Sequence, residues 1–240
     1  MSDDLSHARL IERRKACRVC MQRHPGKIRN SAEYDFDPDV VSHWSQWLGH
    51  PQPDLLVIGQ DFGNVAYFED HRGQDDPANQ TNAKLADLLR EAGFDPGMPP
   101  NPATARVYLA NAVLCAKVGK MNTPLRTAWV RACAEHLIRP LANVLKPLAT
   151  VGMGGEGWRS VRIVYELAET PQKISAAAGG SWRAADGTMV FAVGHCGLLG
   201  QNGPYGRCWV QQQEDWRRIG VALEELQARS VPWQRCSFPQ

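Results

Sequence analysis

The stretch that decides the fold is Asp54-Leu55-Leu56-Val57-Ile58-Gly59-Gln60-Asp61-Phe62-Gly63. Its first half is a short apolar run that follows Pro53 and ends at a glycine, a pattern typical of a strand buried on both faces of a parallel sheet. Polar and small residues follow at once. We therefore predict a buried strand over 54–59, with candidate functional residues directly after its carboxyl end.

Three further apolar runs of the same kind lie at 107–111, 149–153 and 189–194. Helical patterns separate them, over 82–92 and 124–145, and an amphipathic helix is expected over 209–228. Pro140 must kink or split the second of these helices. This alternation predicts an α/β fold with three α/β/α layers and a central, mainly parallel four-stranded sheet. Ligands of such folds bind beyond the carboxyl ends of the strands, where the strand order reverses.

Composition favours a globular chain, because 43% of its 240 residues are apolar and 22% are charged. The net charge of +2 is too small to imply a polyanionic partner by itself. We divide the chain into a basic N-terminal segment with a Cys-x-x-Cys pair packed on the main body (1–50), an α/β domain (51–229) and a C-terminal tail (230–240). The sequence shows neither a long apolar window nor a signal pattern, so we expect a cytoplasmic monomer with no membrane partner.

Four of the seven cysteines form a candidate metal site. Cys17 and Cys20 are a Cys-x-x-Cys pair in a basic stretch, Cys115 follows the second predicted strand, and Cys133 lies on the next helix. Four thiolates suit zinc or a [4Fe–4S] cluster, although Cys115 and Cys133 can equally be ordinary buried cysteines. The second pair lacks the spacing of a zinc knuckle, which favours iron–sulfur. The remaining cysteines are treated as non-ligands: Cys196, Cys208 and Cys236.

Polar residues at the strand ends are the candidates for chemistry. Asp61 offers a carboxylate, or it caps a turn. Asn111 offers both a donor and an acceptor, or it binds its own backbone. His195 precedes a glycine-rich loop, and it acts either on a ligand or as a structural residue. The aromatic rings of Phe62, Tyr67 and Phe68 suit either a stacking surface or the core.

The ordered motifs 56–61, 108–115, 133–137 and 194–195 resemble those of the uracil-DNA glycosylase superfamily. The cysteine layout is similar to that of its iron–sulfur branch, which implies Cys17, Cys20, Cys115 and Cys133 as ligands of a [4Fe–4S] cluster. Gly-Gln-Asp-Phe-Gly over 59–63 differs from the Gly-Gln-Asp-Pro-Tyr of one branch and the Gly-Glu-Ala-Pro-Gly of the iron–sulfur branch. The last motif reads His-Cys-Gly over 195–197 where the family usually has His-Pro-Ser.

The resemblance implies a DNA glycosylase that hydrolyses the N-glycosidic bond of uracil or another deaminated base in DNA. Asp61 would orient water or stabilise the sugar cation, Gln60 would position water, and His195 would stabilise the leaving anion. Asn111 would read the base. The substrate-binding residues expected around it are Gly59, Phe62, Gly63 and Tyr67.

Gly63 lies where another branch places a tyrosine that blocks the thymine methyl group, so excluding thymine would require another side chain. The basic residues over 13–29 and Arg207 are candidates for contacts with DNA phosphates. The alternatives are a non-catalytic nucleic-acid-binding member of the same fold, and a Cys₄-metal redox or regulatory protein.

Overall fold

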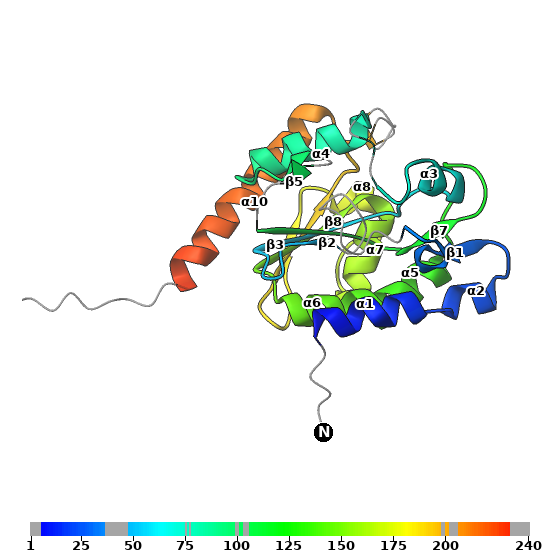
Figure 1. Ribbon diagram of the computed structural model, residues 1–240. Helices are drawn as coiled ribbons and strands as arrows, with labels where there is room; N and C mark the ends of the chain where they lie inside the picture. Colours follow the sequence, from blue (N-terminus) through cyan, green and yellow to red (C-terminus); the bar gives the residue numbers. More distant parts are fainter. Residues whose placement is uncertain are drawn as a thin grey trace, which may run out of the picture.

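The computed structural model forms three layers, with one sheet between two layers of helices (Figure 1). It describes residues 6–36, 48–74, 76, 78–98, 101–102, 106–197, 200–201 and 206–230. No helix in these ranges is long and apolar enough to cross a membrane.

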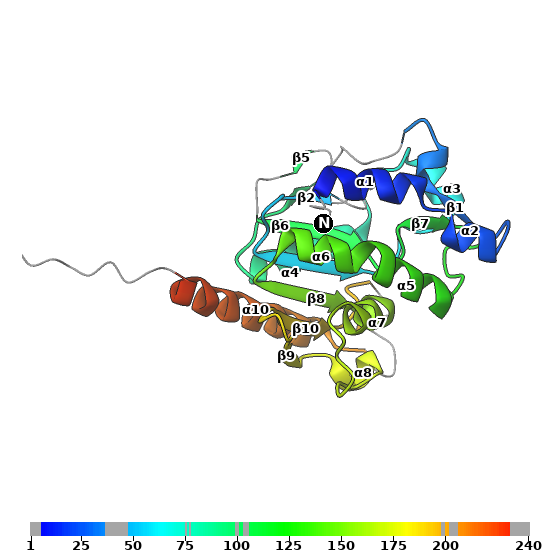
Figure 2. The ribbon, with the colours of Figure 1, turned by 90° about the horizontal axis from the view of Figure 1, so that it is seen from below.

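The central sheet has six strands, in an order visible from the side of α1 and α6 (Figure 2). The four inner strands run parallel and are the four that the sequence predicts. The predicted count of four was nevertheless wrong, because a short antiparallel strand is added at each edge. Strands this short carry no usable periodicity. The order is β2 (Leu48–Gly49), β6 (Val107–Asn111), β3 (Leu55–Gly59), β8 (Ala149–Met153), β10 (Met189–Val193) and β9 (Ser181–Arg183).

The strand order reverses at β3. The chain passes from β3 to β6 on one side and then returns to β8 on the other side. Two crossovers that leave in opposite directions open a crevice at the carboxyl end of β3. Gly59, Gln60 and Asp61 lie there, so the sheet itself positions the residues that the sequence singled out.

Alternate residues of β3 face two different cores. Leu56 and Ile58 pack with the helices on one face, α5 (Thr127–Cys133), α6 (Arg139–Leu145) and α7 (Gly154–Val164). Leu55 and Val57 pack with α4 (Gln80–Glu91) and α10 (Trp209–Ser230) on the other. Two short helices complete this part of the chain, α3 (Val65–Asp70) and α8 (Ile174–Ala177).

The predicted helix over 124–145 is divided, as expected from Pro140. A π-helical turn, η2 (Ala134–Ile138), separates α5 from α6, and Pro140 lies in the first turn of α6. Proline has no N–H and its ring clashes with the carbonyl four residues earlier, so the α-helical hydrogen bonds cannot continue through it.

The N-terminal segment lies against the main body (Figure 2). Helix α1 (His7–Ala16) contacts α6, and β1 (Ile28–Asn30) pairs antiparallel with β7 (Cys115–Lys117). The buried amide of Asn30 donates 2.9 Å hydrogen bonds to the carbonyls of Arg14 and Cys17. The other elements of this segment are α2 (Val19–Arg23) and the 3₁₀ helix η1 (Ser31–Glu33). A separate antiparallel strand pair, β4 (Gly97–Met98) and β5 (Asn101–Pro102), lies between α4 and β6 in the chain.

The prediction that the basic residues over 13–29 contact DNA phosphates was wrong for Arg14. Arg14 is 1% exposed, and its guanidinium donates to the hydroxyl of Ser31, so it cannot contact a phosphate. The division into segments at 50 and 230 stays a prediction, and residues 231–240 lie outside the described ranges.

Candidate functional site

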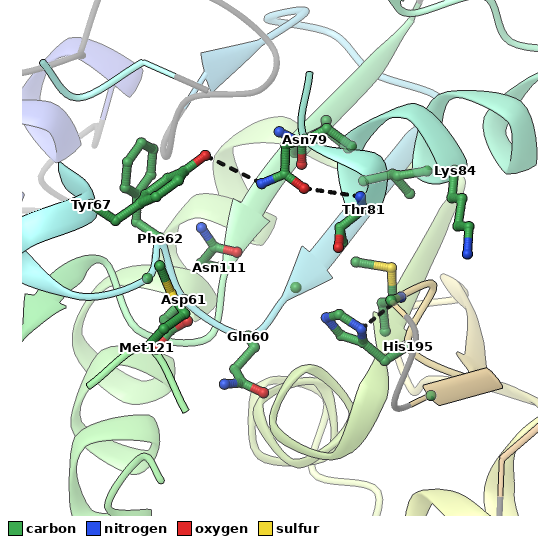
Figure 3. A pocket seen from close by; sticks show the side chains of 18 of the residues that line it. Gln60, Asp61, Phe62, Tyr67, Asn79, Thr81, Lys84, Asn111, Met121 and His195 are labelled. Carbon is green, nitrogen blue, oxygen red and sulfur yellow. Dashed lines mark hydrogen bonds between the residues drawn. The ribbon is translucent and has the colours of Figure 1, made fainter. Parts of the chain in front are cut away.

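A cavity of about 980 Å³ opens beyond the carboxyl ends of β3, β6 and β10 (Figure 3). All eight residues predicted for catalysis or substrate binding line it, although they come from three strands, the loops that follow them and helix α3. They are Gly59, Gln60, Asp61, Phe62, Gly63, Tyr67, Asn111 and His195. The structure therefore brings the predicted set together, and the role of each residue stays a prediction.

Asn111 ends β6 directly beside the end of β3. Gly59 is its partner in the ladder, and a Cβ on Gly59 would lie 2.8 Å from Asn111 Oδ1. A larger residue at 59 would therefore push the Asn111 side chain out of place. The Asn111 amide makes no hydrogen bond to the described part of the chain, so both its donor and its acceptor remain available to a ligand.

His195 follows β10 and enters the same cavity from the other side. Its Nδ1 accepts a 2.9 Å hydrogen bond from the backbone N–H of Gly197. In the neutral ring the proton therefore resides on Nε2, which faces the cavity in Figure 3. Burial lowers the pKa of His195 below 6.5, so the neutral form is favoured. The site thus presents a neutral N–H donor opposite Asn111.

Asp61 forms a buried ion pair that sequence reasoning missed. Its Oδ2 accepts a hydrogen bond from Lys117 Nζ at 2.8 Å, and the two side chains are 7% and 1% exposed. Burial raises the pKa of Asp61, while the Lys117 ammonium and the Gly63 N–H oppose that rise. Lys117 lies on β7, two residues after Cys115, and no pattern in the sequence marks it.

The predicted aromatic surface is partly core. Phe62 is 6% exposed and packs edge-on against Phe68, with ring centroids 5.0 Å apart. Tyr67 is less buried, and its hydroxyl accepts a 3.2 Å hydrogen bond from Asn79 Nδ2. Tyr67 is therefore held in one orientation, and both rings form one wall of the cavity.

The first turn of α4 forms a second wall that the sequence analysis did not assign. Asn79 caps the helix by accepting a 2.9 Å hydrogen bond from the N–H of Thr81. Asn82 Nδ2 is buried and has no hydrogen-bond partner among the described residues, although it belongs to a cavity-lining residue. An asparagine before an apolar helical pattern is an N-cap signal, and it could have placed this turn.

Two contacts fasten the His195 loop to α4, and a third closes the loop on itself. Cys196 Sγ donates to the carbonyl of Thr81 at 3.4 Å. Lys84 Nζ donates to Gln201 Oε1 at 3.2 Å, and Gln201 Nε2 donates to the carbonyl of Cys196 at 2.7 Å. The two walls are thus built as one unit.

The predicted phosphate contact of Arg207 does not fit its surroundings. Its guanidinium binds the carboxylate of Asp215, whose side chain is 1% exposed. Arg207 therefore supports the start of α10 rather than presenting a free cation.

The four candidate metal ligands are distant in sequence, but they line one second pocket, which is small and apolar. Cys17, Cys20, Cys115 and Cys133 all border it. Burial, with the neighbouring Cys17 thiol acting in the same direction, raises the pKa of Cys20 to about 11. Burial likewise raises that of Cys133 to about 12. In the described ranges no group of His, Cys, Asp or Glu side chains has the geometry of a formed metal site.

The chemistry of this donor set nevertheless fits a four-thiolate centre. Four cysteine side chains border one apolar pocket, and four thiolates are a donor set that suits zinc or a [4Fe–4S] cluster. Burial raises the pKa of Cys115 and Cys133, and the nearby Arg14 cation opposes only part of that rise. The other described cysteines lie elsewhere, since Cys196 is part of the His195 loop and Cys208 is exposed.

Comparison with known proteins agrees with this geometry. No curated protein matches the chain. The sequence model of the uracil DNA glycosylase superfamily matches residues 47–213, a span that contains every residue of the large cavity. That match sets aside the alternative of an unrelated Cys₄-metal protein. The chain belongs to the uracil DNA glycosylase superfamily.

Proposed function

We propose that the protein is a DNA glycosylase that takes uracil or another deaminated base out of the DNA stack and hydrolyses its N-glycosidic bond, acting as a monomer. One observation carries the proposal. Asn111 and the Nε2–H of His195 approach a single cavity from opposite sides, and Gln60 and Asp61 line the same cavity at the strand-order reversal (Figure 3).

Base recognition follows from the unused hydrogen-bonding groups of the cavity. Uracil presents an imide N–H flanked by two carbonyls, and an amide side chain matches one N–H and one carbonyl at once. Asn111 has both of these groups available. The buried Nδ2 of Asn82 is a further donor for a base carbonyl.

Bond cleavage places negative charge on the departing base. A donor that is already oriented in a buried site stabilises that charge without reorganisation. Nε2–H of His195 fits this task, because the Gly197 N–H fixes the ring and burial keeps it neutral. A neutral donor stabilises the anion without transferring a full proton beforehand.

The sugar acquires positive charge in the same step. An ionised carboxylate stabilises an oxocarbenium-like sugar or orients the attacking water. Asp61 has about four acceptor positions as a carboxylate. Lys117 and the Gly63 N–H use part of this capacity, and the rest is available to a water. Gln60 has no basic group, so its amide only positions water.

For the cysteine pocket we propose a structural [4Fe–4S] cluster held by Cys17, Cys20, Cys115 and Cys133, with zinc as the alternative. Bound there, the metal centre would supply no reaction step and would link the N-terminal segment to β7 and α5. Iron and acid-labile sulfide in anaerobically purified protein would support the cluster, whereas stoichiometric zinc without sulfide would replace it.

The experiment that tests the function uses uracil-containing oligonucleotides, single- and double-stranded, and scores alkali-labile breaks. Wild-type protein should cleave at uracil, and Asp61→Asn should lose most of that activity while retaining DNA binding. Absence of cleavage by folded, metal-loaded wild-type protein would reject uracil, and the same assay with other deaminated bases would then decide whether any base is released.

A second candidate function has an observation of its own. The carboxylate of Asp61 already binds Lys117 and is 7% exposed, an arrangement also expected of a structural ion pair. This observation favours a non-catalytic member that binds DNA through the same cavity. DNA binding that depends on Asn111, with no base release and no effect of Asp61→Asn, would favour that candidate.

A further inference from the structure

Gly63 leaves a gap in the cavity wall, and the side chain of Met121 covers it. A Cβ on Gly63 would lie 3.1 Å from Met121 Sδ and 3.4 Å from Tyr67 Cδ1. Gly63 also has a φ of +110°, a conformation in which a larger residue would be strained. Met121 therefore occupies the place toward which a residue-63 side chain would project.

The backbone that carries Met121 is fixed, whereas its side chain is not. The N–H of Thr123 donates to the carbonyl of Lys120 at 2.9 Å, which closes a turn with Met121 near its tip. Asn64 Nδ2 donates to the carbonyl of Gly119 at 2.8 Å and ties this turn to the end of β3. Met121 is 48% exposed and has three rotatable side-chain bonds, so it adapts where Tyr67 is held by Asn79.

The position of this wall decides which part of a base it contacts. His195 lies on one side of the cavity, and Phe62, Tyr67 and Met121 lie on the other (Figure 3). In a pyrimidine ring, C5 is directly opposite C2. A base whose C2 carbonyl meets Nε2–H of His195 therefore turns its C5 edge toward the wall that Met121 completes.

We infer that Met121 determines specificity by setting the size of the substituent that the cavity accepts at C5 of a pyrimidine base. The inference rests on the proposed function for the orientation of the base. The wall combines the fixed ring of Tyr67 with the adaptable side chain of Met121. Because residue 63 is a glycine and has no side chain, Met121 sets the largest C5 substituent that the cavity accepts.

The test compares bases that differ only at C5, all placed opposite guanine in one duplex. Uracil, thymine and 5-bromouracil are each carried on a 2′-fluoro sugar, which resists cleavage, so that the readout is the dissociation constant. Met121→Ala should improve binding of the 5-substituted bases relative to uracil by about tenfold, and Met121→Phe should worsen it by a similar factor. Val118→Ala, at an exposed apolar residue that directly follows β7 and does not line the cavity, is the matched control and should change nothing.

The possible failures are distinguishable. If neither Met121 variant changes the uracil-to-thymine ratio, the inference is overturned even when uracil is cleaved normally. Altered ratios without any base release on cleavable DNA would support the inference and reject catalysis. If all three oligonucleotides bind like undamaged DNA in every variant, the inference falls together with the assignment of the cavity to a base.

Discussion

The two pockets of the molecule differ in what holds them together. The large cavity is lined by residues from the ends of sheet strands, from the first turn of α4 and from the turn that carries Met121, and hydrogen bonds fasten its walls. The cysteine pocket is small and apolar, and it joins an N-terminal segment to β7 and α5. The first is built around the carboxyl edge of the sheet and fastened to α4, whereas the second brings together thiols whose burial favours the neutral form. We therefore expect the large cavity to keep its shape without a ligand, whereas the shape of the cysteine pocket should depend on the metal that it binds.

Strand β7 connects these regions, and removing its buried cation should have the largest effect. Lys117→Met leaves the Asp61 carboxylate buried without its partner, which should lower the free energy of unfolding by about 3–5 kcal/mol. Urea denaturation measures this difference. Lys27→Met is the matched control, because Lys27 is exposed and lies beside the same strand pair.

The double variant Asp61→Asn with Lys117→Met sharpens the result. It removes both charges, so most of the lost stability should return even though catalysis does not. If Lys117→Met alone is as stable as the wild type, the ion pair is not a structural link between the two pockets.

The large cavity alone should respond to His195→Asn. The Asn oxygen replaces Nδ1 as acceptor for the Gly197 N–H, so the loop is retained, but the Nε2–H donor is lost. Base release should fall by roughly 10²–10³. Metal content should equal that of the wild type. Single-turnover kinetics and elemental analysis measure the two quantities, and unchanged kinetics would remove His195 from the mechanism.

The cysteine pocket alone should respond to Cys17→Ala. Because four ligands hold the proposed centre, metal content should fall to a small fraction and trypsin should cut the N-terminal segment faster. Cys208→Ala is the matched control, since Cys208 is an exposed cysteine outside the pocket. Full metal content with wild-type resistance to trypsin in Cys17→Ala would contradict the assigned ligands.

The smallest expected effect is a dependence of stability on pH. Burial lowers the pKa of His195 in the folded protein below its ordinary value of 6.5. Between these two pKa values the unfolded chain binds a proton that the folded protein does not. The contribution of neutral His195 is therefore present above pH 6.5 and is lost as the pH falls through the lower, folded pKa.

Urea denaturation over a pH series should show this loss in the wild type. The decline should be weaker in His195→Asn, and comparing the two cancels the titration of Asp61. Parallel profiles would show that His195 is not buried in its neutral form.

The strand-end residues could be predicted because each follows a marked element. Asp61, Asn111 and His195 come directly after apolar runs, and the carboxyl ends of parallel strands meet at one edge. Lys117 and Met121 could not be found this way, since β7 is three residues long and Met121 sits in a turn. Their positions depend on pairing with β1 and on the bond from Asn64, which are contacts between distant residues.

Helix α7 could not be predicted from the sequence either, because tertiary packing determines where it begins. Its start, Gly154-Gly155-Glu156-Gly157, has low helix propensity, and the sequence analysis assigned no helix there. In the structure a Cβ on Gly157 would lie 2.2 Å from the carbonyl oxygen of Ile58. The glycine is required because α7 crosses β3 closely, so a tertiary contact overrides the local preference.

By itself, the sequence determined the four parallel strands, the helices with strong apolar periodicity and the polar residues at the strand ends. Those features depend on local patterns of burial, which periodicity records. Only the tertiary structure decided the partner of Asp61, the tautomer of His195, the side chain over Gly63 and the convergence of the cysteines. Each of these arises from a contact between residues far apart in the chain, and such contacts exist only once the layers have packed.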